Sequence, residues 1–294
     1  MPEAHVILVT HTPERLRRTF LALASQTTPP TTITLSCDVD DDAIRDVAQS
    51  ACDEFAIDLT LVQRAHAGVS RSAQVRNNAV RAVLEHHPAR DSLLIFLDAD
   101  CVPEPDLVRK HLDMGGVGLV VLAHRYELTE AQTESFDEDA LRRGEWPARP
   151  TADQTQALAH RAKRLRRQAR LRRWGMAKAH KPKLLSANFS VALADYLRVN
   201  GFDETYEGWG QEDDDLGRRL YQIGVRPVIA VDTIAAFHQY HPTRAPRAWE
   251  QGPNASRLSE RAPSRCARGV ENPLEQAAPR HTLLTPRAAT ARTG

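Results

Sequence analysis

Short apolar runs alternate with amphipathic stretches along residues 5–122, and this pattern predicts strands that alternate with helices. The first predicted helix carries Leu16, Phe20 and Leu23 on one face, and a longer helix is predicted over Ser70–Glu85. Strands joined by helices of about ten or more residues are typical of a mostly parallel, doubly wound α/β sheet. We expect its strands at His5–Thr10, Thr32–Cys37, Ile57–Val62, Leu93–Asp98 and Val117–Leu122.

The strand that ends at Asp98 is the centre of this pattern. Five apolar residues run into Asp98-Ala99-Asp100, as in a strand that is buried on both faces and ends in paired acids. Residues two apart in an extended chain point to the same side, so Asp98 and Asp100 can direct two carboxylates to one point. Ligands of open α/β sheets bind at this edge, and paired carboxylates suit Mn2+ or Mg2+. The alternative is that the second acid only caps the next helix.

The second half of the chain returns to strand-like composition. Leu184–Leu193 predicts one strand, and Val228–Phe237 predicts a last pair of short strands that ends at His238 and His241. After Pro242 the chain is rich in Pro, Arg, Ala and Ser, so we expect residues 243–294 to be a disordered tail.

A strongly basic segment separates the two halves. Residues 154–183 contain no Asp or Glu, and Leu158, Leu165 and Leu171 give only a thin apolar stripe among many Arg and Lys residues. Two interpretations stay open for the helix predicted here. It is a solvated insertion, or residues 160–183 make a peripheral contact with anionic lipid headgroups or with an acidic lipid-linked acceptor.

Composition narrows the class of protein. A chain of 294 residues with 41% hydrophobic content can build one large domain, and a formal charge of +1 gives no global attraction to nucleic acid, so no nucleic-acid partner is expected. The four cysteines have no paired short spacing, which favours a reducing, cytoplasmic setting. No secretory signal fits before the first strand, and no apolar run approaches the roughly 20 residues of a membrane span. Any membrane contact is therefore expected at the inner surface.

Three polar clusters are predicted at the ligand-binding ends of the strands: Asp98 with Asp100, Gly208–Asp215, and His238 with His241. Each has an ordinary explanation, because Glu212–Asp215 could be the acidic first turn of a helix and a histidine after a strand is often structural. Together they would supply a metal pair, a base and an imidazole ligand.

The chain resembles the inverting glycosyltransferases of family 2, which have the GT-A fold. The resemblance rests on FLDADC and, most specifically, on NGFDETYEGWGQEDDDLGRRL, which is similar to the galactosyltransferase and chondroitin polymerase-like type. It covers residues 1–242 as one domain. It implies a nucleotide-sugar-binding half (1–123), a variable basic helical insertion (124–183) and an acceptor and catalytic half (184–242).

The resemblance also implies roles for single residues. Asp100 would bind Mn2+ or Mg2+ directly, Asp98 would contact the ion or the ribose, and His238 or His241 would complete the metal sphere. Asp213 would be the catalytic base and Glu212 would hold the acceptor, over a floor formed by Trp209 and Gly210. The donor, expected to be a UDP-sugar, would be bound by Thr10, His11, Glu14, Arg76 and Asn77, and by Asp38 or Asp40.

These features predict a metal-dependent inverting transferase that moves a sugar to a glycan or glycolipid acceptor. The Gln-x-x-Arg-Trp motif and the membrane helices of processive synthases are missing, which favours the addition of one sugar at a time. One alternative is a nucleotidyltransferase that makes nucleotide sugars, although its glycine-rich loop is not found in THTPERLRR. The other is a non-catalytic basic adaptor that binds acidic lipid or RNA through residues 160–183.

Overall fold

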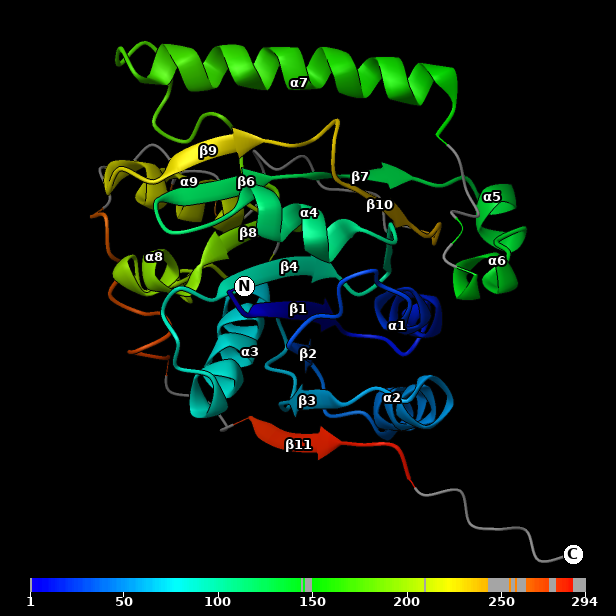
Figure 1. Ribbon diagram of the computed structural model, residues 1–294. Helices are drawn as coiled ribbons and strands as arrows, with labels where there is room; N and C mark the ends of the chain where they lie inside the picture. The colour runs from blue at the N-terminus through cyan, green and yellow to red at the C-terminus, as the bar shows by residue number, and fades with distance from the viewer. Residues whose placement is uncertain are drawn as a thin grey trace, which may run out of the picture.

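The computed structural model describes residues 2–143, 145, 150–208, 210–242, 254, 257, 263–274 and 279–287. At its centre lies an eight-stranded sheet with the order β11-β3-β2-β1-β4-β8-β6-β9 (Figure 1). Strands β8 and β11 run antiparallel to their neighbours, and the remaining pairs are parallel. The predicted mostly parallel α/β sheet is thus confirmed. Its strands are β1 (Ala4–Thr10), β2 (Thr32–Cys37), β3 (Leu59–Gln63), β4 (Leu93–Asp98), β6 (Leu119–Leu122), β8 (Asn188–Ala192), β9 (Arg226–Ile229) and β11 (Arg280–Leu284).

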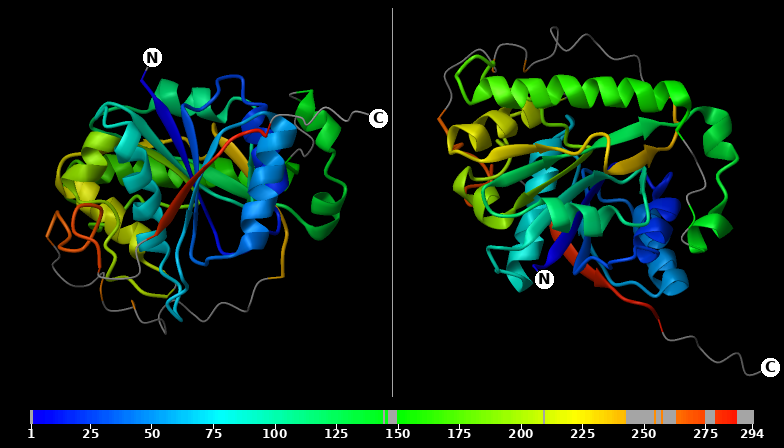
Figure 2. Two further views of the ribbon diagram at one scale, coloured as in Figure 1. Left: turned by 90° about the horizontal axis from the view of Figure 1, so that it is seen from below. Right: turned by 45° about the horizontal axis from the view of Figure 1, so that its top comes forward.

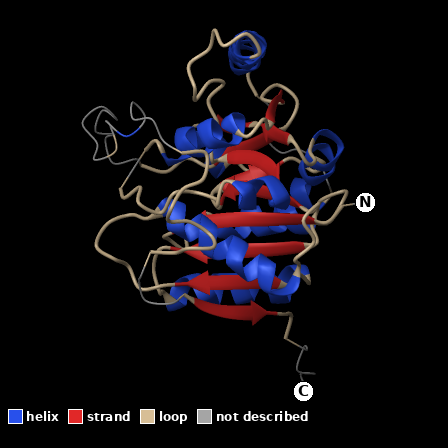
Figure 3. Cartoon of the chain, turned by 90° about the vertical axis from the view of Figure 1, so that its left-hand side faces the viewer, coloured by secondary structure: helices blue, strands red, loops and turns tan. Residues whose placement is uncertain are grey.

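Helices cover both faces of this sheet (Figures 2 and 3). Neighbouring residues of β1 point to opposite faces: Val6 and Leu8 belong to one core cluster and Ile7 to the other. The first cluster is closed by α1 (Leu16–Ala24), α2 (Asp42–Phe55) and α4 (Leu107–Met114). The second is closed by α3 (Ser72–His86), α8 (Leu193–Arg198) and α9 (Glu212–Gln222).

A second, three-stranded sheet stands at the carboxyl edge of the first. It has the order β5-β10-β7, where β5 is Cys101–Pro103, β10 is Ala235–His238 and β7 is His124–Glu127. In its register His238 lies opposite both Cys101 and Glu127. Residues distant along the chain therefore meet beside the end of β4. Two short helices, α5 (Glu130–Glu134) and α6 (Glu138–Arg142), follow β7.

The basic segment forms α7 (Ala152–Arg172), which lies across the side of the molecule beyond β9 (Figure 1). Only Leu158, Ala162 and Leu165 of this helix are buried, so it rests on the second core cluster through one narrow stripe, as predicted. Arg166 also pairs with Asp232 across 2.6 Å. Among the residues that the structure describes, we find no helix with the length and apolar character needed to cross a bilayer.

The prediction of a disordered tail is wrong for part of residues 243–294. Strand β11 pairs antiparallel with the whole of β3, and the side chains of Cys266, Val270 and Leu284 are buried. The composition suggested disorder because its few apolar residues are scattered. The edge strand β3, however, offers unpaired backbone groups that a short segment can satisfy without an apolar core of its own.

Candidate active site

Asp98 and Asp100 lie at the end of β4, where the chain passes from the eight-stranded sheet into β5 of the three-stranded sheet. Their carboxylate oxygens and the thiol sulfur of Cys101 lie within 4.8 Å of one another, which agrees with the predicted convergence of the two acids. Asp98 accepts a hydrogen bond from Arg125 (2.7 Å), and its other oxygen lies 3.5 Å from Arg76. Burial and the charge of Asp100 raise the pKa of Asp98, although both arginines oppose that shift.

Two histidines converge on Asp100. The Oδ2 atom of Asp100 lies 3.1 Å from Nε2 of His238 and 3.3 Å from Nε2 of His241. The other ring nitrogen of His238 lies 2.5 Å from Glu127. Burial disfavours the charged form of His238, but the carboxylates of Asp100 and Glu127 outweigh it and raise its pKa to about 9. Both histidines offered as alternatives by the sequence thus reach the same carboxylate.

This donor set fits a divalent transition-metal ion. The ligand atoms of Asp100, His238 and His241 lie within 4.8 Å of one another, and they combine carboxylate oxygen with imidazole nitrogen. Mn2+ accepts that mixture, and Glu127 is positioned to orient His238 from behind, as carboxylates do for metal-bound imidazoles. The residues present therefore suit Mn2+, one of the two ions that the sequence predicts.

The four consecutive acids at the start of α9 have four different partners. Glu212 accepts a hydrogen bond from Ser72 (2.9 Å) and lies 3.5 Å from Arg76. Asp214 pairs with Lys183 (3.0 Å), and Asp215 pairs inside the protein with Arg219 (2.8 Å). Asp213 accepts a hydrogen bond from the backbone N–H of Asp214 (2.8 Å). The four acids do form the first turn of a helix, but each has a different environment.

Asp213 is poised to exchange a proton near neutral pH. Burial and the neighbouring charges of Glu212 and Asp214 raise its pKa to about 7, and Lys183 and the hydrogen bond from Asp214 only partly oppose them. A carboxylate with a pKa close to the working pH is well suited to general base catalysis.

A cavity of about 1070 Å3 lies between Asp98 at the end of β4 and the start of α9. That volume is at the upper end of the range for small-molecule sites, which is roughly 300–1,000 Å3. Of the predicted residues, Arg76, Asp98, Gly210, Glu212 and Asp213 line it. Gly210 has a φ of +103°, and its carbonyl accepts a hydrogen bond from Asn254 (3.0 Å). Trp209, predicted as the acceptor floor, lies outside the described residues.

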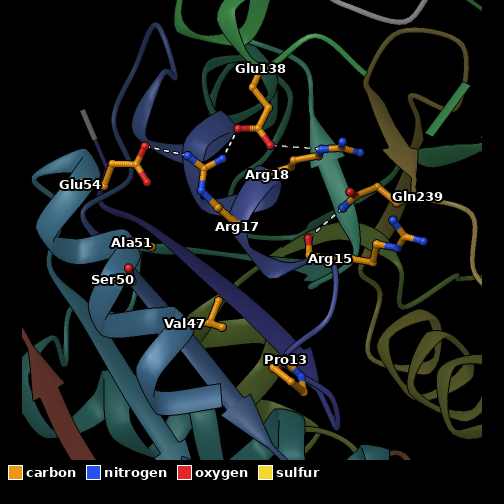
Figure 4. Close-up of a pocket in the computed structure, with 10 residues that line it drawn as sticks. All are labelled: Pro13, Arg15, Arg17, Arg18, Val47, Ser50, Ala51, Glu54, Glu138 and Gln239. Atoms are coloured by element: carbon orange, nitrogen blue, oxygen red, sulfur yellow. Dashed lines mark hydrogen bonds and ion pairs between the residues drawn. The ribbon is translucent and has the colours of Figure 1, made fainter. Parts of the chain in front are cut away.

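The loop between β1 and α1 is hydrogen-bonded to Gln239, which directly follows β10. Gln239 donates through Nε2 to the carbonyl of Arg15 (2.8 Å) and through its backbone N–H to the carbonyl of Asp100 (3.0 Å) (Figure 4). Thr10 begins this loop and accepts a hydrogen bond from the backbone N–H of Thr12, while His11 and Glu14 are exposed. A smaller cavity of about 310 Å3 lies behind the loop, where Arg17 and Arg18 are paired with Glu138.

The two acids after β2 have different environments. Asp38 is buried, accepts a hydrogen bond from Arg64 (2.9 Å) and a second from the backbone N–H of Arg71 (3.1 Å). Asp40 is on the surface and pairs with Arg280 of β11 (2.5 Å). Asp38 therefore connects the ends of β2 and β3 to the start of α3, whereas Asp40 connects to the C-terminal segment.

Asn77 lies in the interior. Its side chain donates to the carbonyl of Phe202 (2.8 Å) and to Glu204 (2.9 Å), and it accepts hydrogen bonds from the hydroxyl of Tyr196 and the backbone N–H of Phe202. The side chain is fully buried, and its hydrogen bonds to Phe202 and Glu204 hold the segment before α9 against α3. The neighbouring Gly201 has a φ of +70°, and a Cβ there would lie 2.5 Å from Oδ1 of Asn77.

Sequence comparison assigns this site to a family. Residues 6–172 match the model described as glycosyl transferase family 2, which is more than half of the chain. The chain belongs to glycosyl transferase family 2. Residues 167–242, which contain β8, α9 and β10, also match a model described as the N-terminal domain of galactosyltransferase.

Among similar proteins is the validoxylamine A glucosyltransferase of Streptomyces hygroscopicus subsp. limoneus, 29% identical over 81% of this chain and 52% of that protein. The family 2 chain thus spans about half the length of this relative. Among solved structures, S. aureus TarS with UDP-GlcNAc (TM-score 0.50, 13% identity) matches 82% of this chain and 60% of its own. GalNAc-T7 with UDP, GalNAc and Mn2+ (TM-score 0.53, 14% identity) matches 82% and 44%. At these identities the two structures show the GT-A fold alone.

Sequence reasoning missed two charged residues of this family 2 site, Arg125 and Glu127. Both belong to β7, which we assigned to the variable insertion, yet Arg125 binds Asp98 and Glu127 contacts His238. The signal was weak but present: His124–Glu127 directly follows a predicted strand, and residues 125 and 127 share one side of an extended segment. Two residues of the range 124–183 thus contact predicted site residues.

Proposed function

We propose that this family 2 chain is a metal-dependent inverting glycosyltransferase that uses a nucleotide-diphosphate sugar. The observation that carries the proposal is the placement of two chemically different groups around one edge of the sheet. Asp100, His238 and His241 form a cluster suited to a metal ion, and Asp98 lies beside Asp100. Asp213, with its pKa near 7, lines the adjoining cavity together with Asp98.

The donor diphosphate belongs at the metal-ion cluster. Mn2+ or Mg2+ bound there would neutralise the charge that develops on the leaving nucleoside diphosphate. Arg76 lies between Asp98 and Glu212, at 3.5 Å from each, so its guanidinium can contribute positive charge on the cavity side. We assign Thr10, His11, Glu14 and one of the two acids after β2 to the nucleoside. Both acids are engaged within the protein, Asp38 with Arg64 and Asp40 with Arg280, so either can be the one that contacts the base.

Asp213 acts as the base in this proposal. The acceptor hydroxyl must attack the anomeric carbon from the face opposite the leaving group, and Asp213 takes its proton as the new bond forms. A single displacement inverts the configuration and needs no covalent nucleophile. Glu212, held by Ser72, would fix the acceptor, with Trp209 and Gly210 on the floor of the subsite.

The comparisons and the cavity support a proposal for the donor and acceptor classes. The relative is named a glucosyltransferase and the two structural neighbours hold UDP, which supports a UDP-hexose donor. A glycan or glycolipid hydroxyl is the proposed acceptor. The loop that follows α7 contributes Lys178, Lys181 and Lys183 to the cavity wall, and Arg172 fixes this loop by donating to the carbonyls of Lys178 (3.0 Å) and Lys181 (2.6 Å).

We also propose that α7 makes a peripheral contact with an anionic membrane on its cytoplasmic side. The outward face of α7 holds His160, Lys163, Arg164, Arg167 and Arg170, and Trp174 and Met176 beside it are 72% and 62% exposed. Basic side chains next to an exposed indole suit an interface with anionic headgroups. Co-sedimentation with phosphatidylglycerol vesicles should fall when Lys163, Arg167 and Trp174 are replaced by Ala, and unchanged binding would exclude this contact.

A screen of nucleotide sugars tests the proposed activity. In the presence of Mn2+, at least one UDP-sugar should release UDP, and EDTA should stop the release. Release of pyrophosphate from a nucleoside triphosphate and a sugar phosphate would instead support a nucleotidyltransferase. No turnover of any donor, together with vesicle or RNA binding that depends on residues 160–183, would support the adaptor.

A further inference from the structure

A second group of metal-ligating side chains lies at the opposite edge of the sheet from the active site. Glu3 directly precedes β1, His5 is the second residue of β1, and His87 caps the C-terminal end of α3. The proposed active site lies at the opposite ends of these two elements, near Thr10 at the end of β1 and Ser72 at the start of α3. This group is therefore separate from the proposed sugar-transfer chemistry.

Two distances between these side chains are close to those found in a coordination sphere. Nε2 of His5 lies 3.6 Å from one oxygen of Glu3, and Nδ1 of His87 lies 3.4 Å from the other. One ligand atom from each residue lies within 4.8 Å of the other two. In a tetrahedral Zn2+ site, with bonds of about 2.0–2.2 Å, neighbouring ligand atoms are separated by roughly 3.3–3.6 Å.

The surroundings of the His5 ring resemble those of a metal-bound histidine. Its ring is fully buried, Nδ1 lies 2.9 Å from the hydroxyl of Thr32, and Nε2 has no hydrogen-bond partner among the described residues. A buried nitrogen without a partner is costly unless something binds it. With Nδ1–H donating to Thr32, the lone pair of Nε2 faces Glu3 and His87, and such a second partner commonly fixes the tautomer of a metal-bound imidazole.

The other two ligands leave the site accessible. The side chains of Glu3 and His87 are 40% and 28% exposed, so an ion can enter from solvent and a water molecule can complete its sphere.

We propose that Glu3, His5 and His87 form a second metal site, which takes Zn2+ or a similar borderline divalent ion. Two imidazoles and one carboxylate suit Zn2+ better than Mg2+ or Ca2+, which prefer oxygen ligands alone. An ion bound here links the start of β1 to the end of α3. It stabilises the fold because it binds the native arrangement of these ligands and not the unfolded chain.

Zinc titration of the full chain tests the site, with stoichiometry and thermal unfolding as readouts. Because Zn2+ can also bind at Asp100 and His238, the titration is done in an Asp100→Ala/His238→Ala background, which isolates the second site. One equivalent should bind and raise the unfolding temperature. His87→Ala should lose that equivalent, while His86→Ala, which removes the exposed neighbouring histidine, should keep it.

Thr32→Val provides a second measurement, because it spares all three ligands. It should weaken Zn2+ binding about 10–100-fold, as expected for loss of a residue that orients a metal-bound imidazole. Equal zinc binding by the His87→Ala and His86→Ala variants, or no zinc bound in the Asp100→Ala/His238→Ala background, overturns the proposal. In that case Glu3 and His87 form a simple ion pair.

Discussion

Asp100 and His238 are 138 residues apart in the sequence, yet Oδ2 of Asp100 lies 3.1 Å from Nε2 of His238. The contact exists because β5 and β10 pair antiparallel, with His238 opposite Cys101. The pairing of these two short strands thus sets the relative position of two residues that we expect to bind the ion.

From this contact we predict that Asp100→Ala abolishes the Mn2+-dependent part of UDP affinity. The substitution removes the carboxylate that both His238 and His241 approach, so the ion loses its central ligand. Calorimetric titration of UDP with and without Mn2+ measures the effect. Asp113→Ala, which removes an exposed carboxylate on α4, serves as the control and should bind like the wild type. Unchanged Mn2+-dependent affinity in Asp100→Ala would remove this residue from the metal site.

Asp213→Asn should lower the transfer rate by about 10²–10⁴-fold, the usual contribution of a general base. The amide keeps the size of the side chain and its contact with the start of α9, so UDP-sugar affinity should stay within a few fold. Single-turnover transfer and donor titration separate the two effects. Asp214→Asn, which loses the pair with Lys183 but not the base, should have a smaller effect on the rate. A large loss of donor affinity in Asp213→Asn would contradict the assignment.

The pH dependence of kcat/KM should show a single limb that rises with pH through about 7. Asp213 must be deprotonated to accept a proton, and burial together with Glu212 and Asp214 raises its pKa to about 7. Below that pH the base is protonated and activity falls about tenfold per pH unit. Glu212→Gln removes one of the charges that raise this pKa, so the limb should move to lower pH. A limb that stays in place would argue against Asp213 as the titrating group.

The sequence predicted the centre of the sheet well because β1 and β4 contain apolar runs. The five apolar residues from Leu93, which we predicted as a buried strand running into Asp98, do lie in β4, and the acids of Asp98-Ala99-Asp100 converge as the pleat requires. Periodicity and turn chemistry are local properties, so they could be read without knowing any tertiary contact.

The parts that could not be predicted depend on pairing between distant segments. Nothing local in RHTLL indicates that β11 would pair with β3, and nothing local in HRYE indicates that Arg125 would bind Asp98. Two of the acids of α9 likewise have partners from distant parts of the chain: Ser72 contacts Glu212 and Lys183 contacts Asp214. Such contacts follow from the fold and cannot be derived from periodicity.

Gly201→Ala should destabilise the protein by about 2–4 kcal/mol. A left-handed backbone costs an ordinary residue roughly 1–2 kcal/mol, and the added Cβ would also displace Oδ1 of Asn77 from its bonds with Tyr196 and Phe202. Gly224→Ala is the matched control: its φ is +89°, but a Cβ there meets nothing within 4 Å, so only the backbone cost applies. Equal losses in urea denaturation would show that the contact with Asn77 does not matter.

The last prediction concerns β11, where two adjacent leucines have opposite environments. Leu284 is 5% exposed and packs into the first core cluster, whereas Leu283 is 68% exposed. Leu284→Ala should therefore cost about 2–3 kcal/mol of unfolding free energy, the lower part of the range for a buried leucine, because the site lies at the sheet edge. Leu283→Ala should change stability by less than about 0.5 kcal/mol.

The two variants replace neighbouring leucines by alanine, so a difference between their unfolding free energies reports the burial of Leu284. A disordered segment would show no difference, because neither leucine would contact the core. Urea denaturation of the full chain, followed by tryptophan fluorescence, gives both values. A loss that is confined to Leu284→Ala requires that the C-terminal segment is part of the folded domain, with β11 closing the edge that β3 would otherwise expose.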